Sequence, residues 1–133
     1  MSIGITGLCI KAAEDDDTVL YTYSGVNHRD SVELCGDLHA QDGLFLISKR
    51  CLEKAEIRTK RKRTKNGRKV FVEKRIYHSP DISRHKENGD IQLLKPCCID
   101  GLSPEWLAFR LIDQIFMAYQ HTDTLPEREY LLM

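Results

Sequence analysis

Cysteine and histidine are the first residues in this sequence to consider for chemistry, and the chain of 133 residues has five of each. A thiol activated by an imidazole is a nucleophile for acyl transfer. The run Cys97-Cys98-Ile99-Asp100 supplies two thiols and a carboxylate, but no histidine stands at a spacing that would place it beside them. The sequence therefore does not indicate cysteine catalysis.

Two other segments contain residue types that ligate metals. Cys35-x3-His39, together with the remote Cys97 and Cys98, comes nearest to a zinc site, but paired ligands such as CxxC are lacking. Residues 78–90 contain the histidines and aspartates of a metal nuclease without a closed motif, and no glycine cluster is a phosphate-binding loop. We therefore predict a non-catalytic protein without metal or cofactor, whose cysteines are free thiols in a reducing compartment.

The distribution of charge is the strongest signal in the sequence. Twenty lysines and arginines balance twenty aspartates and glutamates, so the formal net charge is zero. Residues 58–75 nevertheless contain ten basic residues and one acidic residue, a net charge of +9, whereas residues 1–57 carry −5 and residues 76–133 carry −4. Such a division indicates association with a charged partner.

The basic segment has two functional interpretations and one structural one. A basic two-stranded ribbon fits a nucleic-acid groove, or it lies across the acidic surface of a protein. Basic residues also protect an exposed strand edge from aggregation, but ten in eighteen residues exceed that need. The acidic cluster Glu14–Asp17 is either a solvated turn or a mimic of phosphate groups. The predicted partner-binding residues are Arg58, Lys60, Arg61, Lys62, Arg63, Lys65, Arg68, Lys69, Glu14, Asp15, Asp16 and Asp17.

Five segments have the composition of strands. Residues 3–10 and 18–24 are predicted to form a hairpin around the acidic turn, and the apolar run 43–48 is predicted to be a central buried strand. Residues 90–94 predict a further strand, and residues 127–133 an edge strand or a frayed tail. We expect a loop over residues 78–88, whereas residues 27–41 are ambiguous between a short helix and a loop.

The basic segment and the C-terminal segment have the clearest local patterns. Asn66-Gly67 is a strong signal for a two-residue hairpin turn, which would place Lys60 opposite Glu73 and Arg58 opposite Arg75. Ser103 is a favourable N-cap for a helix that continues to about residue 121 with apolar residues at i, i+3 and i+4 spacing. This helix should supply much of the core.

Three segments resemble pieces of small bacterial immunity proteins from contact-dependent inhibition and other polymorphic toxin systems. They are DGLFLISKRCLEK (42–54), TKNGRKVFVEKRI (64–76) and PEWLAFRLIDQIFMAYQ (104–120). The resemblance implies a protein that binds its cognate toxin and blocks the active site or the entry of substrate. Many such toxins are nucleases, whose basic clefts attract acidic surfaces. The class has no universal motif, so the resemblance assigns no functional residue.

These observations lead to one set of expectations. We predict a single α+β domain over residues 1–133, with a mostly antiparallel sheet packed against a C-terminal helix (103–121) and a projecting basic hairpin (57–77). Its expected function is neutralisation of a cognate protein toxin, with nucleic-acid binding through the hairpin as the alternative. The first residues lack signal-peptide features and no apolar run has the length of a membrane span, so we expect a cytoplasmic protein without a membrane partner.

Overall fold

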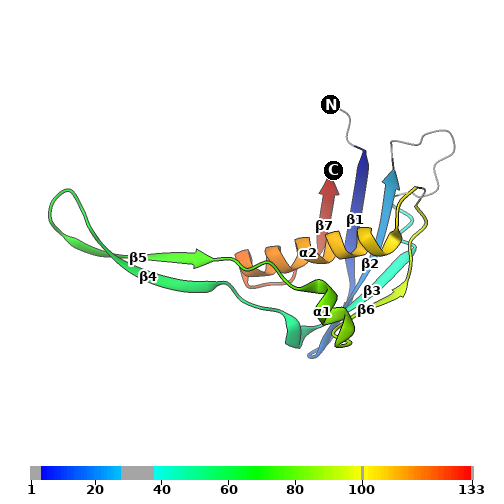
Figure 1. Cartoon of the computed structure of the whole chain (residues 1–133), viewed down its shortest axis with the longest axis horizontal. Helices are drawn as coiled ribbons and strands as arrows, with labels where there is room; N and C mark the ends of the chain where they lie inside the picture. The colour runs from blue at the N-terminus through cyan, green and yellow to red at the C-terminus, as the bar shows by residue number, and fades with distance from the viewer. Residues whose placement is uncertain (1–3, 28–37, 100, 133) are drawn as a thin grey trace.

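Antiparallel strands packed against one long helix form the body of the protein in a computed structural model, which describes residues 4–27, 38–99 and 101–132 (Figure 1). The predicted α+β class is confirmed. The body contains a five-stranded sheet in the order β6-β3-β2-β1-β7. These strands are β1 (Ile5–Glu14), β2 (Thr18–Asn27), β3 (Gly43–Ser48), β6 (Ile91–Lys95) and β7 (Arg128–Leu132).

The strands agree with the sequence prediction in number and in their order along the chain, but their bounds and burial differ from it. β1 and β2 form the predicted hairpin and extend farther than predicted, and the C-terminal residues form an edge strand that pairs with β1. β3 is an interior strand as predicted, but its burial alternates because only one face of the sheet packs against the helix: Phe45 is buried and Leu46 is half-buried. Most of the ambiguous stretch 27–41 lies outside the described residues.

The C-terminal helix α2 (Pro104–Thr122) begins and ends within one residue of the prediction. The Ser103 hydroxyl accepts a hydrogen bond from the Trp106 backbone N–H at 3.4 Å, which satisfies a donor at the first turn. At the other end, Asp123 adopts a left-handed conformation (φ 58°) and its N–H donates to the Tyr119 carbonyl. Local capping therefore determines both ends of α2.

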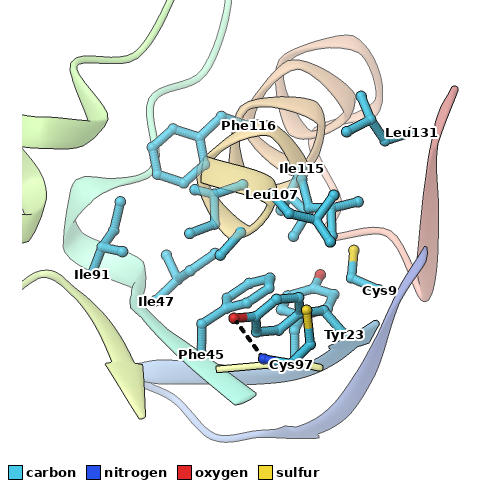
Figure 2. Packing of buried hydrophobic residues seen from close by; sticks show 14 of the residues in the cluster. Cys9, Tyr23, Phe45, Ile47, Ile91, Cys97, Leu107, Ile115, Phe116 and Leu131 are labelled. Atoms are coloured by element: carbon cyan, nitrogen blue, oxygen red, sulfur yellow. Dashed lines mark hydrogen bonds between the residues drawn. The ribbon is translucent and has the colours of Figure 1, made fainter. Parts of the chain in front are cut away.

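The core lies between α2 and the sheet (Figure 2). The apolar stripe of α2, including Leu107 and Ile115, is fully buried against aromatic residues of the middle strands. Phe45 lies between two tyrosines, with ring centroids 5.6 Å from Tyr21 and 5.4 Å from Tyr23. The Tyr23 hydroxyl accepts a hydrogen bond from the Cys97 backbone N–H at 3.3 Å, so its polar end is satisfied inside the core.

Residues 78–88 are not a continuous loop, contrary to the prediction. A short helix, α1 (Ile82–Glu87), occupies the second half, and the Asp81 side chain caps it by accepting from the Arg84 N–H at 3.2 Å. Helical periodicity is not detectable over so few residues. The capping aspartate was the available signal.

The basic segment forms a separate two-stranded ribbon, β4 (Glu56–Arg63) and β5 (Lys69–Ile76), as predicted, but its register is shifted by one residue. The loop has three residues, Lys65 to Gly67. The Thr64 N–H donates to the Arg68 carbonyl, the Gly67 N–H donates to the Thr64 carbonyl, and Gly67 has a φ of 75°. This loop requires a positive φ at glycine alone, whereas the predicted two-residue turn requires it at Asn66 as well.

The corrected register changes the cross-strand neighbours. Lys60 lies opposite Val72, so the predicted pair of Lys60 with Glu73 is not formed. Arg58 lies opposite Lys74 and not Arg75, and Arg63 lies opposite Lys69. Like charges that face each other across a ladder are unfavourable. The ribbon therefore has less internal charge compensation than the sequence predicted.

Two glycines allow α2 to approach the sheet closely at Leu107. A Cβ at Gly25 would lie 2.3 Å from one Leu107 methyl, and a Cβ at Gly7 would lie 2.9 Å from the other. Because Leu107 is fully buried, it has little room to move.

We expect Gly25→Ala to lower the free energy of unfolding by about 1–3 kcal/mol through overpacking. Urea denaturation checks this. The cost should become smaller in a Leu107→Ala background, because the clashing methyl is then absent. An equal cost in both backgrounds would contradict the packing explanation.

Candidate functional site

The ribbon of β4 and β5 extends away from the sheet and α2 (Figure 1). Every residue of β4 is exposed, and so is every residue of β5 except Ile76, which is half-buried where the ribbon joins the body. The eight predicted basic residues all lie on the ribbon or between its two strands: Arg58, Lys60, Arg61, Lys62, Arg63, Lys65, Arg68 and Lys69. The structure therefore brings this part of the predicted site together.

Most of the cations on the ribbon are uncompensated. Arg58 forms an ion pair with Glu56 at 3.0 Å, and Arg75 lies 3.6 Å from Asp123. The other eight form no ion pair within the described residues: Lys60, Arg61, Lys62, Arg63, Lys65, Arg68, Lys69 and Lys74. Their charges are concentrated on a narrow arm in solvent, where they are available to a partner.

Arg75 fixes the base of the ribbon to the end of α2. Its Nη1 donates to the carbonyls of Gln120 and His121 at 3.2 and 2.8 Å. These belong to the last turn of the helix, whose carbonyls lack partners within the helix and carry partial negative charge. Arg75 is therefore a structural residue, although it belongs to the basic segment.

Gln120 makes the second contact at the base. Its side chain, in a residue only 2% exposed, accepts from the His78 N–H at 2.7 Å and donates to the His78 carbonyl at 2.6 Å. The Tyr77 ring packs on the His121 ring at 4.0 Å between centroids. On the β4 side, His78 Nε2 lies 3.5 Å from a carboxylate oxygen of Glu56. These contacts hold the two ends of the ribbon together and set its direction.

We expect Gln120→Ala to destabilise the protein by about 1–3 kcal/mol, because both backbone polar groups of His78 lose their partner. Gln114→Ala is the matched control, since Gln114 is a half-buried glutamine of the same helix with no such contact among the described residues. Urea denaturation measures both. Equal stability of the two variants would contradict the anchoring role.

The predicted acidic cluster is largely committed to local structure. The Asp15 side chain accepts from the N–H groups of Asp17 and Thr18 at 2.8 and 2.7 Å, which closes the turn between β1 and β2. These hydrogen bonds hold the pKa of the Asp15 carboxyl below its usual value. Glu14 lies 3.7 Å from both Lys11 and Lys49.

Asp15, Asp16 and Asp17 are all exposed and form no ion pair with the described residues, but Asp15 Oδ1 is hydrogen-bonded within the turn. The Asp17 carbonyl accepts from the Lys49 N–H at 2.8 Å, so the turn lies against the short helix η1 (Lys49–Cys51) of the body. The ribbon extends elsewhere (Figure 1). The acidic turn and the basic ribbon are therefore separate surfaces.

The lowered pKa of Asp15 makes its contribution to stability present at neutral pH and lost as the pH falls through the folded-state pKa. Asp15→Asn keeps an acceptor oxygen but cannot titrate, so we expect it to reduce the loss of stability on acidification. Urea midpoints at neutral and acid pH measure this loss. Asp16→Asn, at an exposed position in the same turn, should match the wild type.

The three cysteines that the structure describes as free do not supply a nucleophile. Cys9, Cys51 and Cys97 are buried free thiols. Burial raises the pKa of Cys9 to about 12 and those of Cys51 and Cys97 to about 11, so these thiols are protonated at neutral pH. Cys98 is disulfide-bonded, which corrects the prediction of free thiols at that position.

The histidines and aspartates of residues 78–90 do not converge on a metal site. Asp90 pairs with Arg50 and lies 3.7 Å from His85 Nδ1, whereas Asp81 caps α1. Within residues 4–27, 38–99 and 101–132, no three histidine, cysteine, aspartate or glutamate side chains are grouped to hold a metal ion. A cavity of about 490 Å³ beside this segment is lined by residues of both charges, several already paired.

Three consecutive apolar residues in the half of β5 nearer the loop form a feature whose importance was not recognised from the sequence. Val70 and Val72 are each 39% exposed, and Phe71 is 72% exposed. The signal was present as a continuous Val-Phe-Val run, but the basic residues around it dominated the interpretation. Because side chains alternate along a strand, Val70 and Val72 lie on one face of the ribbon and Phe71 on the other. The run therefore exposes apolar surface on both faces, which indicates an interaction surface.

No protein-family model matches the chain, and neither does any curated protein or solved structure. Among the described residues, neither helix combines the length and the apolar character needed to cross a lipid bilayer.

Proposed function

We propose that this protein is a non-catalytic immunity protein whose basic ribbon binds a cognate toxin and obstructs its active site or substrate entry. The observation that carries the proposal is the set of eight unpaired cations on an exposed ribbon, Lys60 to Lys74, with an anchored base. An arm of fixed direction loses little conformational freedom on binding. Its charge would accelerate encounter with an acidic surface and favour one orientation.

The apolar residues of β5 favour a protein partner over a nucleic acid. Val70, Phe71 and Val72 gain stability when a partner removes them from water, and a protein surface offers apolar side chains for this purpose. Phosphate contacts would use the cations alone. The acidic turn plays a smaller part than the sequence predicted, because Glu14 and Asp15 already have partners.

Nucleic-acid binding is the second candidate function. A two-stranded ribbon has dimensions that the major groove of duplex DNA admits, and basic residues occur on both faces of the ribbon. Each lysine or arginine that contacts a phosphate would release counterions, so affinity would fall steeply with salt.

The first test is neutralisation of a toxin encoded beside this protein. We expect co-expression to rescue cells from the toxin, and Lys62→Glu/Arg63→Glu to weaken binding to the toxin at least about tenfold. Lys95→Glu/Arg128→Glu changes the net charge equally at exposed positions outside the ribbon and should bind normally. Isothermal titration calorimetry measures the affinities.

Binding to duplex DNA is the result that would contradict the proposed function. Micromolar binding to duplex DNA that falls steeply with salt and is lost in Lys62→Glu/Arg63→Glu, without binding to any neighbouring toxin, would replace the proposed function with the second candidate.

A further inference from the structure

The two strands of the ribbon differ in how their outer edges are protected. β4 has the sequence EIRTKRKR, with charged residues along its length and a single large apolar residue, Ile57, near the body. β5 has the sequence KVFVEKRI, with Val70, Phe71 and Val72 consecutive in the half nearer the loop. Charged residues are the usual protection of an edge strand, whereas an apolar β-branched and aromatic run favours pairing. β4 is protected along its length, whereas the Val70–Val72 stretch of β5 lacks this protection.

The hydrogen bond at the loop shows which backbone groups face outward. Thr64 and Arg68 form a hydrogen-bonded pair, with Thr64 N–H donating to the Arg68 carbonyl at 2.9 Å. Because such pairs alternate along an antiparallel ladder, the pairs of Arg61 with Phe71 and of Thr59 with Glu73 are not hydrogen-bonded to each other. The N–H and C=O groups of Phe71 and Glu73 therefore point away from β4.

This outer edge has no strand beside it in the described part of the chain, where β5 pairs with β4 alone. Residues Lys69 to Arg75 are all exposed. A two-stranded ribbon is marginally stable by itself, and a third strand would satisfy the outward backbone groups and cover the apolar run.

We propose that the outer edge of β5 accepts an extended segment of the toxin as a third strand, and that this segment has an apolar centre flanked by acidic residues. The inference rests on the proposed function and specifies how the ribbon binds. An apolar centre would pack beside Val70, Phe71 and Val72, and acidic residues at each end would lie beside Lys69 and Lys74.

Charge excludes the ribbon of a second copy of this chain as the third strand. Residues 58–75 carry a net charge of +9, so two ribbons placed edge to edge would repel each other strongly. An acidic strand gains from the same charges. Lys60 and Lys62 on β4 lie opposite Val72 and Val70, so their long side chains surround the apolar run on one face.

Proline tests the edge because it has no N–H and is tolerated where that group is unused. We expect Glu73→Pro to weaken binding to the toxin at least about tenfold, although removal of the carboxylate makes the ribbon more basic. Thr59→Pro is the matched control on the opposite edge, directly across from Glu73, and should bind like the wild type. Glu73→Gln separates the loss of charge from the loss of the N–H and should not weaken binding.

Hydrogen exchange on the wild-type protein tests the edge independently of any variant. The probe is a synthetic peptide with a central run of valine and threonine and glutamates at each end. We expect the amides of Phe71 and Glu73 to exchange at least about tenfold more slowly with the peptide bound, while those of Thr59 and Arg61 are unchanged. Absent protection, or protection at Thr59 and Arg61, would overturn the inference.

The outcomes separate the inference from the function on which it rests. If Lys62→Glu/Arg63→Glu abolishes toxin binding but Glu73→Pro does not, the ribbon binds the toxin through its side chains and the edge inference is wrong. If neither Lys62→Glu/Arg63→Glu nor Glu73→Pro affects toxin binding, the ribbon is not the interface, and the proposed function through the ribbon fails too.

Discussion

The buried amide of Gln120 is the contact on which the position of the ribbon depends. It satisfies both backbone polar groups of His78, the second residue after β5, and the adjacent Arg75 guanidinium caps the last carbonyls of α2. A lone two-stranded ribbon has too little buried surface to fix its own orientation. Orientation therefore comes from α2, whose own position is set by the core that Leu107 and its neighbours form with the sheet. The packing of the body therefore fixes the direction of a ribbon that buries almost no surface of its own.

The arrangement separates stability from interaction. The apolar face of α2 and one face of the sheet supply the core, and several charged residues of the body pair with one another, as Glu14 does with Lys11 and Lys49. The ribbon contributes little to that core and carries the excess of positive charge. Because its residues are almost all exposed, substitutions there should alter association more than folding. This separation is the physical basis of the proposed binding role.

Most of the fold was predictable because its signals are local. The caps of α2, the composition of β1 and β2 and the turn at Gly67 depend on residues close together in the chain. The errors came where local signals were equivocal. α1 is too short for periodicity to reveal it, and the hairpin register depended on whether Asn66 adopts a positive φ, which a three-residue loop makes unnecessary. The candidate site was found through its charge. The role of the acidic cluster was overestimated, because a count of charges does not reveal that Asp15 is hydrogen-bonded within its turn.

The sequence by itself determined that an acidic body carries one strongly basic segment, since charge and short-range pairing are properties of the chain order. Tertiary structure decided which of those charges are free. Arg75 and Arg58 are drawn into contacts at the base of the ribbon, whereas the cations beyond them are left in solvent. It also exposed the Val70–Val72 run, whose composition alone would suit a buried strand equally well. Burial depends on contacts between residues far apart in the chain, as between Gln120 and His78, and such contacts exist only once the body has folded.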